Sequence, residues 1–255
     1  MEIKITDLQK AIVFVELFQY LKQFVSIISL TLKTDQFYIQ GMDSSQISIF
    51  EISLMNDWFD EYNIKKDTVI GININIFAKI LHIYKNPQTI SLIINEDTME
   101  IKFENDTKDF NKEFIMPLVD FESEHLAIPE KEYDMDIEME SKKFKNFIDE
   151  LAIFGDVLTI KYEDENIILT SQSDTEGSMK LLMKAEDLEE CSVNEEVQTI
   201  CSFRIKYLQY MTQYYKLSKY VLLNFTNDTP MHCRYILHEN KKNFIQFHLA
   251  PVMDN

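Results

Sequence analysis

The chain contains two similar halves, and this internal repeat constrains its fold more than any other feature of the sequence. A run with apolar side chains at i, i+3, i+4 and i+7, typical of an amphipathic helix, begins at Phe14 and returns at Phe144. Further matched pairs of strand-like and helix-like segments follow in the same order: 35–39 with 165–169, 74–85 with 205–216, and 113–116 with 246–249. Several elements that repeat at nearly constant spacing predict two similar domains, each with two helices among many strands.

The predicted fold class is therefore α+β, with a first domain at 1–117, an interdomain connector at 118–134 and a second domain at 135–255. Residues 116–133 contain two prolines and many acidic residues, which is typical of a linker that crosses a surface. Acidic and apolar residues alternate along 134–140. This period of two predicts a strand with its apolar side on the core and its carboxylates in water.

The charge of the chain limits the ways in which it can bind nucleic acid. A net charge of -18 argues against a simple nucleic-acid binder, because phosphates repel acidic surfaces. The lysines, however, concentrate in the helix-like segments, whereas acids dominate the strand-like segments and the connector.

The three cysteines are too few and too scattered for a disulfide framework. Polar side chains interrupt the apolar stretch at 11–32, so we expect a soluble intracellular protein without a membrane span.

The sequence lacks the patterns of the common catalytic and cofactor sites. Its four glycines form neither a phosphate-binding loop nor a dinucleotide-binding fingerprint. No nucleophile elbow or triad pattern is present, and the histidines and cysteines do not have the spacing of zinc ligands. We therefore expect no enzymatic activity, no cofactor and no metal site. A distant alternative is a metal-dependent nuclease built on the carboxylates of 134–140.

Six short motifs, in order along the chain, resemble the signatures of one family. They are GMDSSQIS at 41–48, IGIN at 70–73, AKIL at 78–81, HLAIPEKEY at 125–133, FGD at 154–156 and LAP at 249–251. Together they resemble the eukaryotic-type DNA sliding clamps of the proliferating cell nuclear antigen family, and the resemblance covers essentially the whole chain. It implies a closed homotrimer with helices around a central hole and sheets outside. Such a ring encircles duplex DNA, serves as a polymerase processivity factor and recruits replication and repair proteins.

The resemblance implies that basic side chains of the helices face double-stranded DNA without reading its sequence. The expected DNA-facing residues are Lys22, Lys79, His82, Lys85, Lys142, Lys143, Lys145, Arg204, Lys206, Lys216 and Lys219. Lys79, His82 and Lys85 recur at i, i+3 and i+6, so we expect them to share a rough helix face. The alternative is that these lysines only solubilise an exposed face. The chain departs from the family at Asn146 and Asp149, where related clamps carry arginines.

A second implied surface is a pocket for partner peptides with a glutamine, an aliphatic residue and two aromatics. Such peptides would come from a DNA polymerase, a clamp loader, a flap nuclease and a ligase. The matching positions are Met42, Gln46, Ile47, Ile49, Leu126, Ile128, Pro129, Pro230, His248, Leu249, Ala250 and Pro251. His248 stands where the family commonly has tyrosine. The alternative is that these apolar residues are ordinary core.

Two alternating apolar stretches are expected to close the ring as edge strands. One carries Phe110, Phe114 and Met116, and the other Met179, Leu181 and Met183. A closer alternative to the homotrimer is a clamp-like subunit of a heterotrimeric or damage-response ring. The expected location is the nucleus, or the replication compartment of a host cell if the protein is viral.

Overall fold

The computed structural model describes residues 1–105, 110–121, 126–128, 131–194, 196–238 and 240–252. The chain forms two compact units. The first comprises Met1–Ser44, Glu51–Leu126 and Asn240–Phe244, and the second comprises Ser45–Phe50, Ala127–Glu239 and Ile245–Asn255. No helix in the described part of the chain is long and apolar enough to cross a membrane.

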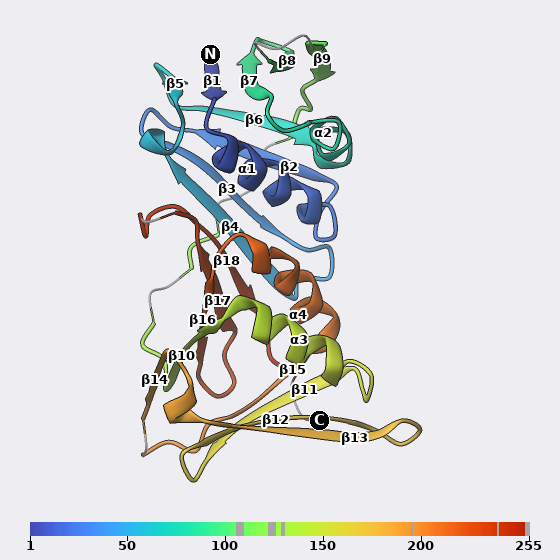
Figure 1. Cartoon of the computed structure of the whole chain (residues 1–255), viewed down its shortest axis with the longest axis vertical. Coiled ribbons are helices and arrows are strands. Elements are labelled where there is room, and N and C mark those ends of the chain that lie inside the picture. Colours follow the sequence, from blue (N-terminus) through green and yellow to red (C-terminus); the bar gives the residue numbers. More distant parts are fainter. Residues whose placement is uncertain (106–109, 122–125, 129–130, 195, 239, 253–255) are drawn as a thin grey trace. The chain divides into compact units, whose positions relative to one another are not determined.

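Within the described residues, the first half of the chain forms two α-helices among nine strands (Figure 1). In chain order the elements are β1 (Glu2–Ile5), α1 (Leu8–Leu21), β2 (Ile27–Leu32), β3 (Gln36–Met42), β4 (Ser48–Met55), the 3-10 turn η1 (Asn56–Trp58), β5 (Glu61–Asn63), β6 (Thr68–Asn73), α2 (Ile74–Leu81), β7 (Thr89–Ile94), β8 (Thr98–Glu104) and β9 (Lys112–Pro117).

The second half repeats this order. Its elements are β10 (Met135–Glu140), α3 (Ser141–Leu151), β11 (Val157–Glu163), β12 (Asn166–Ser173), β13 (Gly177–Lys184), the 3-10 turn η2 (Ala185–Asp187), β14 (Glu190–Val193), β15 (Ile200–Arg204), α4 (Ile205–Thr212), the 3-10 turn η3 (Gln213–Lys216), β16 (Tyr220–Phe225), β17 (Met231–Ile236) and β18 (Phe244–Leu249).

The strand order shows that the repeat extends to the topology of the sheets. The first unit has a five-stranded sheet in the order β5-β1-β7-β8-β9, and the second unit has the matching order β14-β10-β16-β17-β18. A second layer runs β4-β3-β2-β6 in the first unit and β13-β12-β11-β15 in the second. Each strand thus occupies the place of its counterpart in the other half. The predicted duplication and the α+β class are confirmed.

Aromatic side chains fill the core of the first unit. Phe18 of α1 lies 4.8 Å from Phe77 of α2 and 4.9 Å from Phe14, measured between ring centroids, and all three are fully buried. Edge-to-face contacts of this kind add to the free energy gained from burial alone. The core of the second unit uses Tyr214 and Phe247, whose ring centroids are 5.4 Å apart. The apolar positions predicted from periodicity in α1 and α3 are buried in both units, except for Phe147 of α3, which is partly exposed.

The acidic and apolar alternation at 134–140 forms the strand β10. Met135, Ile137 and Met139 are buried, and the acidic residues between them are partly exposed. β10 pairs with β14 on one side and β16 on the other, so its carboxylates lie on a face of the sheet. The prediction of a half-buried strand is confirmed.

Candidate functional surfaces

Helices α1 and α2 pack against each other in the first unit. Asp7 is the N-cap of α1, and its carboxylate accepts hydrogen bonds from the backbone N–H groups of Gln9 at 2.8 Å and Lys10 at 2.9 Å. The Gln19 amide donates to the backbone carbonyl of Ala78 at 2.7 Å and joins the two helices. This contact fixes α1 relative to α2, and with them the positions of the side chains on their exposed sides.

The predicted helix face with Lys79, His82 and Lys85 is wrong in its last member. α2 ends at Leu81, His82 is its C-cap, and Lys85 lies in the turn beyond. That turn is closed by a hydrogen bond from the Gln88 N–H to the Lys85 carbonyl at 2.8 Å. The apolar period extends past the helix because Tyr84 packs on Phe103 of β8, with ring centroids 5.8 Å apart.

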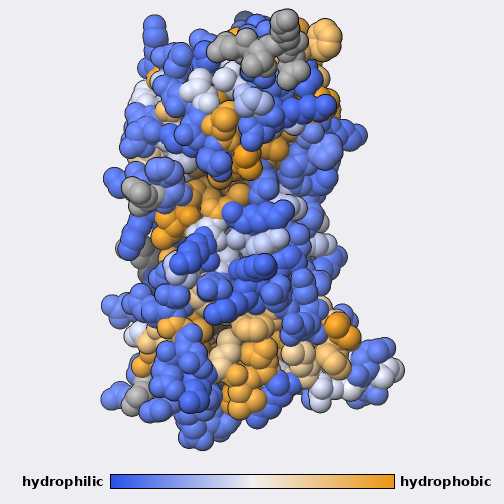
Figure 2. Space-filling model, in the orientation of Figure 1, coloured by the Kyte–Doolittle hydropathy of each residue, from blue (hydrophilic) through white to orange (hydrophobic). Residues whose placement is uncertain are grey.

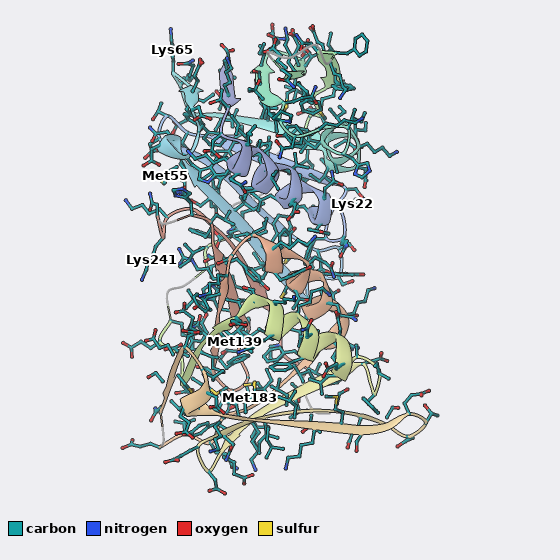
Figure 3. All side chains as sticks on the ribbon, in the orientation of Figure 1. Lys22, Met55, Lys65, Met139, Met183 and Lys241 are labelled. Carbon is teal, nitrogen blue, oxygen red and sulfur yellow. The ribbon has the colours of Figure 1, made fainter. Side chains whose placement is uncertain are left out.

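Two exposed cations of the first unit remain on the helices themselves. Lys79 lies on the exposed side of α2, and its neighbours Ala78 and Ile80 are buried. Lys22 caps the C-terminus of α1 and is exposed (Figure 3). A lysine at a helix C-terminus interacts favourably with the helix dipole, which offers a purely structural role for Lys22 beside the predicted one.

The basic residues at the start of α3 are partly neutralised by acids of the same unit. Lys142 and Lys143 are exposed, and the ammonium of Lys143 lies 3.8 Å from the Glu140 carboxylate. Lys145 is 2.5 Å from Asp149 one turn further along the helix. Asp149 occupies a position where the resemblance implies an arginine. Instead of adding a positive charge, residue 149 forms an ion pair with Lys145 in the same helix.

The α4 region presents lysines over tyrosine rings. Lys206 lies 5.8 Å from the ring of Tyr210, and both Lys145 and Lys216 lie 5.8 Å from the ring of Tyr215. Such contacts hold a cation on an aromatic face while leaving it accessible. Lys206 and Lys216 are exposed. Single-sequence reasoning did not assign these tyrosines to the surface, although their spacing beside lysines was visible.

The tyrosine buried at the end of this helix is next to the one that the repeat matched. The match of 74–85 with 205–216 aligns Tyr215 with Tyr84, but Tyr214 is the fully buried residue. α4 changes into the 3-10 turn η3 after Thr212. Because a 3-10 turn has three residues per turn, the core-facing position falls one residue earlier. Arg204 and Lys219, which flank this region, are exposed.

The connector is attached to the first unit on both sides of residues 122–125. Before them, the Val119 N–H donates to the Gly71 carbonyl at 2.8 Å. A Cβ on Gly71 would lie 2.3 Å from the Val119 carbonyl oxygen, so only glycine allows this approach. After them, the Gln40 amide donates to the Leu126 carbonyl at 2.9 Å and accepts from the Leu126 N–H at 2.7 Å. The predicted surface linker is therefore hydrogen-bonded to the first unit at Val119 and at Leu126.

A pocket of about 250 Å³ lies beneath this part of the connector in the first unit. Met42, Leu126, Phe121 and Ile28 contribute to its apolar lining, and the side chain of Gln40 reaches it from β3. Met42 and Leu126 are two of the predicted peptide-pocket residues, and this unit brings them together. The volume and the apolar lining of this pocket suit one aromatic side chain of a bound peptide.

The predicted pocket residues of the second unit fall into exposed and buried groups. The Ala250 N–H donates to the Ile47 carbonyl at 2.9 Å, so these two predicted positions are neighbours. Leu249 is fully buried in the core, so a contact of its side chain with a peptide stays a prediction. Its neighbour His248 lies on the opposite face of β18 and is partly exposed, and Ala250 follows the end of the strand. A strand places successive side chains on opposite faces, and the motif LAP gave no sign of which residue was inside.

His248 takes part in an aromatic stack on the face of the second unit's sheet. The ring centroids of His248 and His232, which lies on β17, are 4.9 Å apart. The ring of Tyr133 also stacks on His232, with centroids 6.2 Å apart. Among the remaining predicted pocket residues, Gln46 and Pro230 are exposed, and Ile49, Ile128 and Pro251 are partly exposed. Pro129 lies outside the described residues.

Both predicted closing segments form the outermost strands of their sheets. β9 is the last strand of the five-stranded sheet, and β13 is the last strand of its four-stranded layer. Phe114 is partly exposed, whereas Met116 is 1% exposed and faces the core of its own unit, so its predicted interface role stays a prediction. Phe110 precedes β9 rather than lying in it. Met179, Leu181 and Met183 are partly exposed along β13.

The described residues contain no group of three or more His, Cys, Asp or Glu side chains arranged to hold a metal ion. Asp136 of β10 instead accepts a hydrogen bond from the Asn224 amide at 2.6 Å.

All three cysteines are free thiols. Burial raises the pKa of Cys233 to about 12, and burial, with the nearby Asp228 and Asp134 charges, raises that of Cys201 to about 11. A thiol with a raised pKa is a poor nucleophile at neutral pH.

Family models account for nearly the entire chain. The model for the N-terminal domain of proliferating cell nuclear antigen matches residues 2–125, and the model for its C-terminal domain matches residues 127–252. The chain belongs to the proliferating cell nuclear antigen family. Among solved structures, the PCNA2-PCNA3 complex from Sulfolobus tokodaii contains a chain with the same fold. The two chains superpose with a TM-score of 0.87 at 23% sequence identity, over 98% of this chain and 99% of that one.

Membership of the proliferating cell nuclear antigen family gives the sliding-clamp fold that the six motifs implied, with the two similar domains that the repeat predicted. Sequence reasoning missed the residues that hold the connector, above all Gln40. A glutamine in a strand carries no signal of its own, because its partner Leu126 is brought near only by the fold. Gly71 was visible inside a motif, but its contact with Val119 was not.

Proposed function

We propose that this member of the proliferating cell nuclear antigen family acts as a homotrimeric DNA sliding clamp. The observation that carries the proposal is the presence of two unlike edge strands, β9 and β13, on a chain of this family. An exposed edge invites pairing with another chain. Pairing between unlike edges joins copies head to tail, which closes into a ring when the rotation allows.

The ring would hold duplex DNA by topology rather than by strong contacts. The candidate contacts are the exposed cations of the helices, such as Lys79, Lys142 and Lys206. Each phosphate contact adds affinity and salt dependence, and many of them would slow movement along DNA. The ion pairs of Lys143 and Lys145 reduce the number of free cations and favour weak, sequence-independent contact.

The ring would recruit replication and repair proteins through peptides of the glutamine, aliphatic, aromatic and aromatic type. The supporting residues are Met42 and Leu126 in the first unit, and Ile47, Ile128 and Ala250 in the second. A DNA polymerase, a clamp loader, a flap nuclease and a ligase are the expected carriers of such peptides. In this role the protein is a scaffold without catalysis, acting in the nucleus or in the replication compartment of a host cell.

The first experiment is a mass measurement of the purified chain by multi-angle light scattering across micromolar concentrations. A trimer mass supports the ring, whereas a monomer at every concentration contradicts it. The second is primer extension by a polymerase and clamp loader on circular and linear templates. Stimulation that persists on the circle and declines on the linear template supports retention by topology, because an encircling ring runs off free ends.

A heterotrimeric ring is the second candidate. The Sulfolobus tokodaii structure, whose fold this chain shares, is a complex of two different proliferating cell nuclear antigen subunits. Under this alternative the purified chain remains monomeric alone and reaches trimer mass only when its partner subunits are added. The light-scattering series therefore separates the two candidates.

A further inference from the structure

The second unit contains an apolar pocket beside the edge strand β13. It has a volume of about 260 Å³, and its apolar lining is formed by Met139, Phe147, Leu182, Met183 and Leu188. Figure 3 shows Met139 and Met183 near each other at this place, and Figure 2 shows an apolar area below α3 in the same part of the view. A cavity of about 150 Å³ with such a lining holds a benzene ring. This pocket is therefore large enough for one aromatic side chain.

The first unit carries an aromatic side chain that its own core does not use. Phe110 is 89% exposed, the highest value among the exposed large apolar residues of the described chain. Its backbone is nevertheless held, because the Gln88 amide donates to the Phe110 carbonyl at 3.4 Å. Next to it, the Asn111 side chain accepts from the Asn105 N–H at 3.2 Å. A phenylalanine displayed on an anchored backbone is typical of a contact with a partner.

The direction of the strands places this side chain and this pocket at matching ends. β8 with β9 and β12 with β13 are antiparallel pairs. If β9 of one copy continues that pattern along β13 of another, the start of β9 lies beside the end of β13. Phe110 precedes the start of β9 at Lys112, and the pocket adjoins the end of β13 at Met183 and Lys184. A parallel arrangement would place Phe110 at the Gly177 end instead.

The inner side of each sheet and the charge of the pocket rim also bear on this contact. Phe114 of β9 packs on Phe103 with ring centroids 5.6 Å apart, on the core side of its sheet, and Phe110 lies two residues before the start of this strand. The pocket also lies on the inner side of β13, because Phe147 of α3 lines it. Its rim carries the acids Glu140, Asp187 and Glu189 against one lysine, Lys143. The Lys112 ammonium donates to the Gln88 side chain at 3.2 Å, and the same side chain donates to the Phe110 carbonyl, so a cation lies close to Phe110 and can meet the acids of the rim.

We propose that Phe110 of one copy inserts into the pocket lined by Met139, Phe147, Leu182, Met183 and Leu188 of the next copy and fastens the ring joint. The proposal rests on the homotrimer proposed above and adds the contact that fixes its strand register. The occupant is a second copy of this chain, since the aromatic side chain, the adjacent edge strand and the complementary charge all belong to this chain.

The first test compares Phe110→Ala with the unchanged protein by sedimentation over a concentration series. The variant removes only an exposed side chain, so folding is expected to be unaffected, and circular dichroism checks this. We expect the concentration at half-assembly to rise at least about tenfold, as for a buried interface anchor. The matched control is Ile200→Ala, which changes a 45% exposed apolar residue on β15, the opposite edge of the layer that contains β13. The control should assemble like the unchanged protein.

The second test places the photoreactive phenylalanine analogue p-benzoylphenylalanine at position 110. Irradiation should join one copy to the next at Met139, Met183 or Leu188, which mass spectrometry of the digest identifies. If the unchanged protein is a trimer but Phe110→Ala assembles equally well, or the cross-link maps elsewhere, the Phe110 contact is refuted and the ring stands. If the unchanged protein is monomeric at every concentration, both proposals are refuted.

Discussion

The side-chain amide of Gln40 makes two hydrogen bonds to the backbone of Leu126. Its Nε2 donates to the Leu126 carbonyl at 2.9 Å, and its Oε1 accepts from the Leu126 N–H at 2.7 Å. Gln40 is only 6% exposed, so neither bond is replaced easily by water. The same Nε2 lies 3.3 Å from the Glu51 carboxylate, which fixes the orientation of the amide. One strand residue thus holds the connector over the 250 Å³ pocket of the first unit.

The first prediction follows from this pair. Gln40→Glu should release the connector, because a carboxylate cannot donate to the Leu126 carbonyl and would lie beside Glu51. The loss of a buried hydrogen bond costs about 1–3 kcal/mol. We expect peptide affinity, measured by calorimetry, to fall about tenfold, and amide exchange at Leu126 to speed up. Gln36→Glu is the matched control, since Gln36 lies on the same strand and bonds Ser53 instead. If amide exchange at Leu126 is as slow in Gln40→Glu as in the unchanged protein, Gln40 does not fix the connector.

The second prediction concerns the DNA-facing helices. Lys79→Ala combined with Lys206→Ala should reduce clamp-dependent primer extension, most visibly at raised salt. Each phosphate contact removed lowers the salt slope of DNA binding by up to about one unit. The control combines Lys65→Ala with Lys241→Ala, because both lysines are exposed and neither lies on a helix (Figure 3). If both double variants behave alike at every salt concentration, the helix lysines are not the DNA contacts.

The third prediction uses the ion pair of α3. Asp149→Asn removes the partner that lies 2.5 Å from the ammonium of Lys145. The freed lysine should strengthen retention on DNA and steepen its salt dependence. The free energy of unfolding should change by less than about 1 kcal/mol, because an exposed ion pair contributes little to stability. Asp164→Asn, which changes an exposed acid in the turn between β11 and β12, controls for net charge. Equal retention for the two variants would show that Lys145 does not contact DNA.

The fourth prediction separates core from pocket among two residues that the motifs treat alike. Leu249→Ala should lower the free energy of unfolding by about 2–5 kcal/mol, because the side chain is fully buried. Ile128→Glu should leave the unfolding transition nearly unchanged and weaken peptide binding by about 2 kcal/mol or more. Chemical denaturation and calorimetry on the same samples give both values. A stable Leu249→Ala protein that has lost peptide binding would return Leu249 to the pocket.

Local pattern and internal repetition were sufficient to predict much of the fold. The period of apolar residues predicted the helices that begin at Leu8 and Ser141, because a helix with one face on a core must repeat every 3.6 residues. The alternation in 135–140 predicted β10 by the corresponding rule for strands. The duplicated order of elements predicted matching sheets. These features can be predicted from the sequence, since each depends on the local pattern of residues or on its repetition.

Other features depend on residues that only the tertiary structure brings together. The sequence did not show that α2 ends at Leu81, because the packing of Tyr84 on Phe103 continues the apolar period beyond the helix. It did not show that Leu249 is core, since the motif LAP fits either face of a strand. By itself the sequence determined the family, the two domains and the concentration of lysines in helices. Only the tertiary structure decided which of those lysines are free, how Gln40 holds Leu126, and that an exposed Phe110 and an apolar pocket coexist in one chain, because contacts between distant residues leave no local period.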